Sequence, residues 1–231
     1  MMVNTLMGVI ASSVFIDTGG PPVITSTSGF DLASSAVIDI PYPTGIQSGD
    51  LLIVFLVSDV TNGVNIWASN MVSGWSLEGH GGNGTTDCTL SIYSKVADGT
   101  ETGNWSMDPA DSQDIGGIML RITNVDPVEA ISAATQALGS TLNVAATTST
   151  VADSLILTAV SFDGSDANTG SNVPSGYTLV ETLQLGSADP TACEVSVAVR
   201  TQASAGAVAA HSWGADVSDG YVSFALVVPP S

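Results

Sequence analysis

The chain has 231 residues, with three Lys or Arg against 22 Asp or Glu and a formal net charge of −19. This charge argues against nucleic-acid binding, which needs Lys and Arg to neutralise phosphates, and it disfavours an anionic membrane surface. Only 11% of the residues are charged and 24 are glycines, a composition typical of a β-rich protein with many tight turns.

The first segment, residues 1–28, is predicted to be an N-terminal arm that ends in a linker at residues 25–28. No Lys or Arg precedes its apolar run, so it lacks the basic region of a signal peptide. The run is also too short to cross a bilayer. We expect the arm to act as a first strand or to dock on a partner through Leu6, Val9, Ile10, Val14, Phe15 and Ile16.

The first half of the folded part contains about six predicted strands, at residues 36–40, 49–58, 73–78, 88–96, 104–107 and 118–122. The second of these is apolar at almost every position, which predicts a central strand buried on both faces. The fourth alternates, with Leu90 and Ile92 on one face and Tyr93 and Lys95 on the other. Residues 79–84 are predicted to form a glycine-rich loop.

The second half repeats this order about a hundred residues later. Asp153 matches Asp50 at an offset of 103, and residues 220–226 match 116–122 at an offset of 104. The pattern predicts an all-β, antiparallel, jelly-roll-like β-sandwich built from two homologous halves, residues 36–126 and 140–230. The connection after residue 123 is short, which favours one domain over residues 29–231 above two tandem domains.

The two cysteines, Cys88 and Cys193, occupy equivalent places in the halves, at an offset of 105. We predict two buried free thiols inherited by duplication rather than a disulfide. No metal-binding Cys/His spacing is present.

Catalytic motifs are absent, and the sequence predicts a protein that is not an enzyme and has no cofactor. His80 lies near Glu78 and Asp87, where a solvated loop explains it as well as a metal or acid–base cluster does. His211 is interpreted as packed or edge-exposed. Turn chemistry explains the acidic loops at residues 108–114 and 163–168, although their oxygens also suit Ca²⁺.

The aromatic residues also recur, since Trp75 matches Tyr177 and Trp105 falls close to the place of Trp213. Such side chains could stack on sugars, as they do in carbohydrate-binding modules. Packing at the same site in both halves is the favoured interpretation.

Four stretches carry a resemblance to a known group of proteins: GIQSGDLLIVFLVS, SGWSLEG, LSIYSKVADGTETGNWSM and IGGIMLRITNVDP. Taken together, the pattern resembles β-sandwich virion proteins of tailed bacteriophages. The resemblance covers residues 36–126 well and residues 142–230 more loosely. It implies a head decoration, fibre or tail-associated protein.

The leading functional prediction is therefore a capsid decoration (cement) protein. Such a protein would form a homo-oligomer, for example a trimer, and would contact other virion proteins such as the major capsid protein. It would reside in the virion, after assembly in the host cytoplasm. The alternative is a receptor- or carbohydrate-binding module of a fibre or tail protein, which predicts that Trp75 or Trp105 is exposed beside the loops at one end.

Overall fold

The computed structural model describes residues 22–31, 37–59, 72–82, 88–108, 114–164, 172–185 and 193–231. All regular structure in these ranges is β-strand, and every pairing between strands is antiparallel. No described segment forms a helix of the length and apolarity needed to cross a membrane. The predicted all-β antiparallel sandwich is confirmed.

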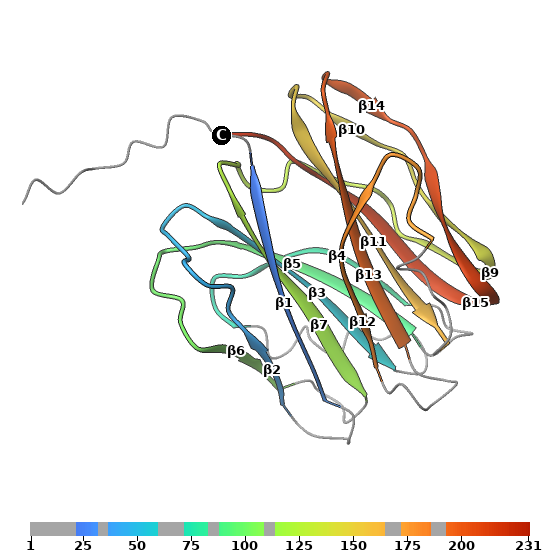
Figure 1. Ribbon diagram of the computed structural model, residues 1–231, viewed down its shortest axis with the longest axis horizontal. Helices are drawn as coiled ribbons and strands as arrows, with labels where there is room; N and C mark the ends of the chain where they lie inside the picture. The colour runs from blue at the N-terminus through green and yellow to red at the C-terminus, as the bar shows by residue number, and fades with distance from the viewer. Residues whose placement is uncertain are drawn as a thin grey trace, which may run out of the picture.

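Two large sheets lie against each other (Figure 1). The first has the order β1 (Val23–Asp31), β7 (Ile115–Thr123), β3 (Leu51–Asp59), β5 (Cys88–Val96) and β4 (Ser76–Gly82). The second has the order β12 (Thr178–Gln184), β13 (Cys193–Gln202), β11 (Ser154–Asp163), β15 (His211–Val228) and β8 (Ala130–Ile131), and β9 (Thr135–Val144) also pairs with β15.

Two short strand pairs complete the described fold. β2 (Ile38–Pro41) pairs with β6 (Asn104–Met107), and β10 (Thr147–Ser149) pairs with β14 (Gly206–Val208). Apolar side chains of β2 and β6 cover the outer face of the first sheet, and side chains from β9, β14 and the start of β15 cover that of the second. The central strands of each large sheet are therefore buried on both faces.

The central strands β3 and β11 are buried along almost their whole length, as predicted. In β3, the side chains of Leu51, Ile53, Phe55 and Val57 join the core between the two sheets. The alternating residues Leu52, Val54 and Leu56 join the outer core under β2 and β6. A strand with apolar layers on both sides needs an unbroken apolar run, which is the pattern in the sequence.

The ladders of the two sheets match in order and register. Phe55 pairs with Ile92 and Ile118, while Ala159 pairs with Val197 and Phe224. These pairings relate β3 to β11 at an offset of 104, β5 to β13 at 105 and β7 to β15 at 106. The descent of both halves from one duplicated unit remains our interpretation of this match.

Two of the offsets that matched the second half of the sequence to the first were wrong. Aligning Asp50 with Asp153 puts equivalent side chains on opposite faces of the sheet, because a shift of one residue reverses a strand's faces. The residue that matches Asp153 is Gly49, and both have a positive φ, 60° and 97° respectively. The match of residues 220–226 to 116–122 is likewise two residues out of register.

The predicted linker at residues 25–28 is also corrected, since these residues lie within β1. Val23 to Asp31 pair in unbroken register with β7, and exposed Val23 and Thr25 alternate with half-buried Ile24 and Ser26. The narrower jelly-roll description is not established, because each sheet takes its strands from one half of the chain only.

The predicted glycine-rich loop at residues 79–84 is largely strand β4, which runs to Gly82. Its glycines allow β4 to approach the second sheet closely. A Cβ atom on Gly79 would lie 2.7 Å from Ile131 Cδ1, and one on Gly81 would lie 2.6 Å from Val222 Cγ1. Residues without a side chain are therefore needed where the two sheets meet.

Cys88 and Cys193 form a disulfide between the sheets, so the prediction of free thiols was wrong. Each cysteine begins its strand, β5 or β13, and both are fully buried in the shared core. Their Cα atoms lie 5.8 Å apart, within the normal range for a disulfide. Equivalent positions of two facing sheets meet here, which their separation of 105 residues did not reveal.

Candidate functional site

The predicted ligand aromatics are mostly buried. Trp105 and Trp213 are each 1% exposed and Trp75 is 9% exposed. Trp75 and Trp105 pack against each other, with ring centroids 5.7 Å apart. These three tryptophans present no ring face to a sugar, so the exposed Trp75 or Trp105 expected of a carbohydrate-binding module is not observed.

The strand register also shows which aromatics are equivalent. Ile40 pairs with Trp105 in the first half, and its counterpart Val144 pairs with His211 in the second. Trp105 therefore corresponds to His211, and Met107 corresponds to Trp213. The approximate match of Trp105 to Trp213 was two residues out of register.

His211 belongs to a polar cluster on the outer face of the second sheet. Its ring stacks on the ring of Tyr177, with centroids 4.7 Å apart. The guanidinium carbon of Arg200 lies 5.1 Å from the centroid of the same Tyr177 ring, a cation–π arrangement. Tyr177 precedes β12, Arg200 lies in β13, and His211 begins β15.

A chain of hydrogen bonds fixes the histidine. Trp213 Nε1–H donates to Thr158 Oγ1 over 3.1 Å, and Thr158 Oγ1 lies 3.0 Å from His211 Nε2. His211 Nδ1 lies 3.2 Å from the carbonyl oxygen of Ala209. A carbonyl only accepts, so Nδ1 carries the proton and Nε2 accepts from the Thr158 hydroxyl.

Burial lowers the pKa of His211, and the charge of Arg200 lowers it further, although the hydrogen bond to Ala209 opposes the shift. Burial also raises the pKa of Tyr177, against the opposing effect of Arg200. At neutral pH the cluster therefore holds a neutral imidazole and a neutral phenol beside one guanidinium.

The free energy of unfolding is expected to fall as the pH decreases below about 6.5, the ordinary pKa of histidine. The folded state disfavours protonated His211, so the unfolded state binds the proton first and the loss is complete below the lowered folded pKa. Urea unfolding of the wild type and of His211→Gln across this range measures the effect. The idea fails if both proteins show the same pH dependence between 7 and 5.

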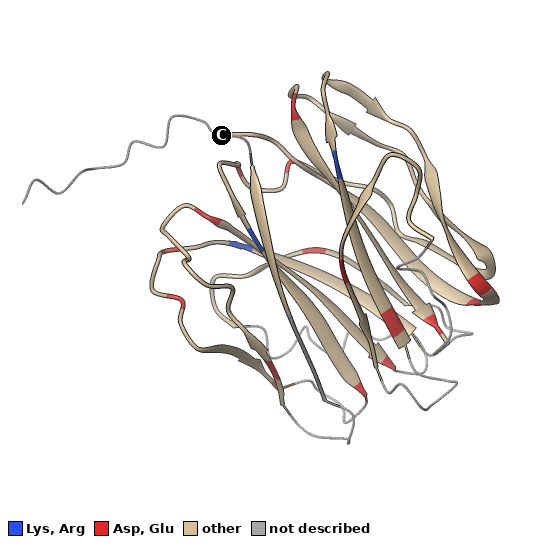
Figure 2. Cartoon of the chain, viewed as in Figure 1, with Lys and Arg blue, Asp and Glu red and all other residues tan. Residues whose placement is uncertain are grey.

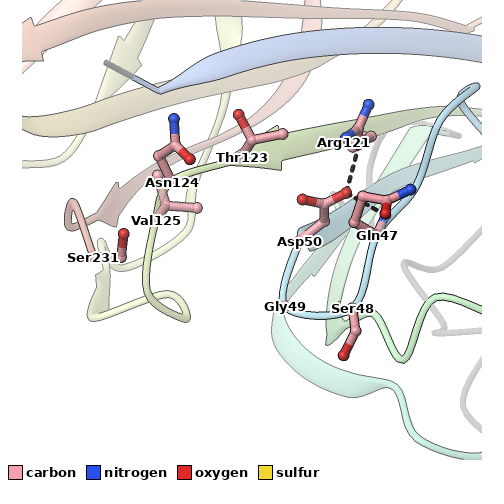
Figure 3. A pocket seen from close by; sticks show the side chains of 9 residues that line it. All are labelled: Gln47, Ser48, Gly49, Asp50, Arg121, Thr123, Asn124, Val125 and Ser231. Atoms are coloured by element: carbon pink, nitrogen blue, oxygen red, sulfur yellow. Dashed lines mark hydrogen bonds and ion pairs between the residues drawn. The ribbon is translucent and has the colours of Figure 1, made fainter. Parts of the chain in front are cut away.

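A second candidate is a pocket of about 670 Å³ at one end of the first sheet (Figure 3). Arg121 Nε donates to Asp50 Oδ2 over 2.6 Å, and the backbone N–H of Gln47 donates to the same oxygen over 2.7 Å. The remaining wall contains Thr123, Asn124, Val125 and Ser231. The Arg121 charge is already balanced by Asp50, so this ion pair anchors the turn before β3.

His80, a considered catalytic or metal residue, lies in β4 with Nδ1 2.9 Å from Ser91 Oγ. Its suggested neighbour Asp87 lies outside the described residues, as do most of both acidic loops. Within the described ranges, no group of three His, Cys, Asp or Glu side chains is placed to hold a metal ion. The six arm residues from Leu6 to Ile16 also lie outside these ranges.

Comparisons with protein families, with curated proteins and with solved structures find no match to this chain. The sequence reasoning found Tyr177 and His211 but did not combine them with Arg200 and Thr158. The equivalence of Lys95 and Arg200 was the available signal, since it places a cation beside the aromatic site in each half.

Proposed function

We propose that the chain is a structural protein of a bacteriophage virion, with a capsid decoration (cement) protein as the favoured type. The observation that carries the proposal is a pair of exposed leucines at equivalent positions on edge strands. Leu77 in β4 is 51% exposed and Leu179 in β12 is 39% exposed. Among the described residues, each of these strands pairs with one neighbour only, so each leaves an edge open to strand addition.

The disulfide supports a protein that works outside a cell, because such bonds persist on virion and cell surfaces and are rare in the cytosol. Assembly in the host cytoplasm then implies that Cys88 and Cys193 become linked after the particle is released. The acidic residues in Figure 2 lie mainly at strand ends and in connecting loops. Self-association would have to bring such surfaces together, so specific apolar contacts must offset charge repulsion.

The apolar arm is the segment proposed to make these contacts. Val23, the first residue of β1, pairs with Thr123, which lines the Arg121 pocket, so β1 begins beside this pocket. The partners in this proposal are further copies of the chain and other virion proteins, without nucleic acid or membrane.

Deleting residues 1–20 is expected to abolish or weaken self-association without unfolding the sandwich. Light scattering after size exclusion measures the mass of the full chain and of the deletion variant. Circular dichroism confirms that the deletion variant keeps its β-structure. Leu77→Lys and Leu179→Lys, each alone, then test which sheet edge takes part.

Two outcomes contradict this assembly mechanism. If the full chain is monomeric at all accessible concentrations, it does not self-associate and the mechanism fails. An oligomer that keeps its mass in the deletion variant and in both lysine variants shows that neither the arm nor these edges hold it together.

A further inference from the structure

Arg200 is the one cation of the chain that lacks a carboxylate partner among the described residues. Lys95 Nζ lies 2.7 Å from Glu101 Oε1, and Arg121 Nε lies 2.6 Å from Asp50 Oδ2. No described carboxylate forms an ion pair with Arg200, although the chain carries 22 acidic residues. A half-buried guanidinium without a counter-ion is energetically unfavourable and calls for an acceptor.

Among the residues that the structure describes, two buried polar atoms of this cluster also have no hydrogen-bond partner. These are Arg200 Nε and the hydroxyl oxygen of Tyr177. A buried polar group left without a hydrogen-bond partner destabilises the folded state. Arginine can only donate and the tyrosine hydroxyl can also donate, so an acceptor group would satisfy both.

The first half of the chain shows which acceptor an equivalent cation takes. Lys95, the counterpart of Arg200, binds the carboxylate of Glu101, whose side chain is only 3% exposed. Offsets of 105 and 106, from the strands on either side, place the counterpart of Glu101 at Gly206 or Ala207. Neither residue has a carboxylate, so the second half keeps the cation and lacks its acid.

The side chains around this cation are also more polar in the second half than in the first. The counterparts of Tyr177, His211 and Thr158 in the first half are Trp75, Trp105 and Val54, and the first-half set offers no hydroxyl or imidazole. The second half therefore combines an unpaired guanidinium with further polar groups. The ring of Tyr177 holds the guanidinium in place, and a planar guanidinium suits two parallel hydrogen bonds to a carboxylate.

We propose that Arg200, together with the Tyr177 hydroxyl, binds a carboxylate supplied from outside the chain. This group takes the role that Glu101 performs internally in the first half. Either a small carboxylic acid or an acidic side chain of a second copy can supply it. The second source rests on the proposed self-association, whereas the first does not.

The test introduces a carboxylate at the position where the second half lacks the counterpart of Glu101. Ala207 is exposed and lies in β14, whereas Gly206 has a φ of 140° that disfavours a side chain. Ala207→Glu should place an internal carboxylate near Arg200, and Ala210→Glu is the control with the same charge at another exposed position. Nitrogen-15 NMR follows Arg200 Nε–H and Trp213 Nε1–H during titration with sodium acetate, against sodium chloride at equal ionic strength.

In the wild type and in Ala210→Glu, acetate is expected to shift these signals saturably while chloride does not. Ala207→Glu should weaken acetate binding by about tenfold or more, the effect of one charge-assisted hydrogen bond. Arg200→Lys, which keeps the charge and loses the planar fork, should also weaken it, as read at Trp213.

A second arm of the experiment distinguishes the source. If a second copy supplies the acid, the Arg200 signal moves with protein concentration without acetate, and Ala207→Glu reduces self-association. The inference is overturned if neither acetate nor protein concentration moves the signal, or if Ala207→Glu and Ala210→Glu behave alike. An oligomer held together by the arm would persist in that case. The proposed function is therefore tested separately, by deletion of the arm.

Discussion

Replacing Cys88 and Cys193 together with alanine is expected to lower the free energy of unfolding by about 3–5 kcal/mol. The disulfide closes a loop across 105 residues, and a loop of this length restricts the unfolded chain strongly. It also joins two sheets that come from different halves of the chain. For a protein of this size the loss corresponds to a decrease in Tm of roughly 6–20 °C.

Differential scanning calorimetry with and without a reducing agent measures this effect. One cycle of unfolding and refolding in the reductant exposes the buried disulfide and should lower the Tm of the wild type. The Tm of the double alanine variant should stay unchanged. A reductant-insensitive wild type that has demonstrably lost its disulfide would show that the bond contributes little. Equal Tm values for wild type and variant without reductant would show the same.

Phe55→Ala is expected to lower the free energy of unfolding by about 3–5 kcal/mol. Phe55 is fully buried at the centre of β3, in the core that both sheets share. The substitution removes the largest side chain of this strand and leaves a cavity that well-packed neighbours fill only in part. The structural counterpart of Phe55 is Ala159, so the two halves fill their shared core unequally.

Urea unfolding of Phe55→Ala and of Phe55→Leu provides the measurement and its control. The leucine variant keeps most of the apolar volume and should lose less than about 1.5 kcal/mol. An unchanged m-value would show that both substitutions act on the folded state. A loss below 1 kcal/mol for alanine would contradict the packing described for the core between the sheets.

The sequence predicted β3 and β11 correctly because burial on both faces leaves a direct trace. A strand covered on each side needs apolar residues at almost every position. Few other structural elements of that length require such a continuous apolar run. The order of strands in each half was visible for the same reason. What the sequence did not contain was the register, because a shift of one or two residues leaves an apolar run looking the same.

Register decided the candidate site. Only the pairing of β9 with β15 shows that His211, not Trp213, occupies the place of Trp105. That equivalence in turn shows that Arg200 lacks a counterpart to Glu101. The sequence had matched Lys95 with Arg200, yet an ion pair depends on a third residue in a turn, which no local pattern marks.

The sequence by itself determined the all-β class, the two central strands and the low content of positive charge, since these follow from composition and local periodicity. Tertiary structure alone decided the disulfide, the burial of Trp75, Trp105 and Trp213, and the polar cluster around Tyr177. Each of these joins residues that are far apart in the chain, and they meet only because two sheets pack face to face in one register. Local sequence carries no information about such a meeting until the facing strands are known.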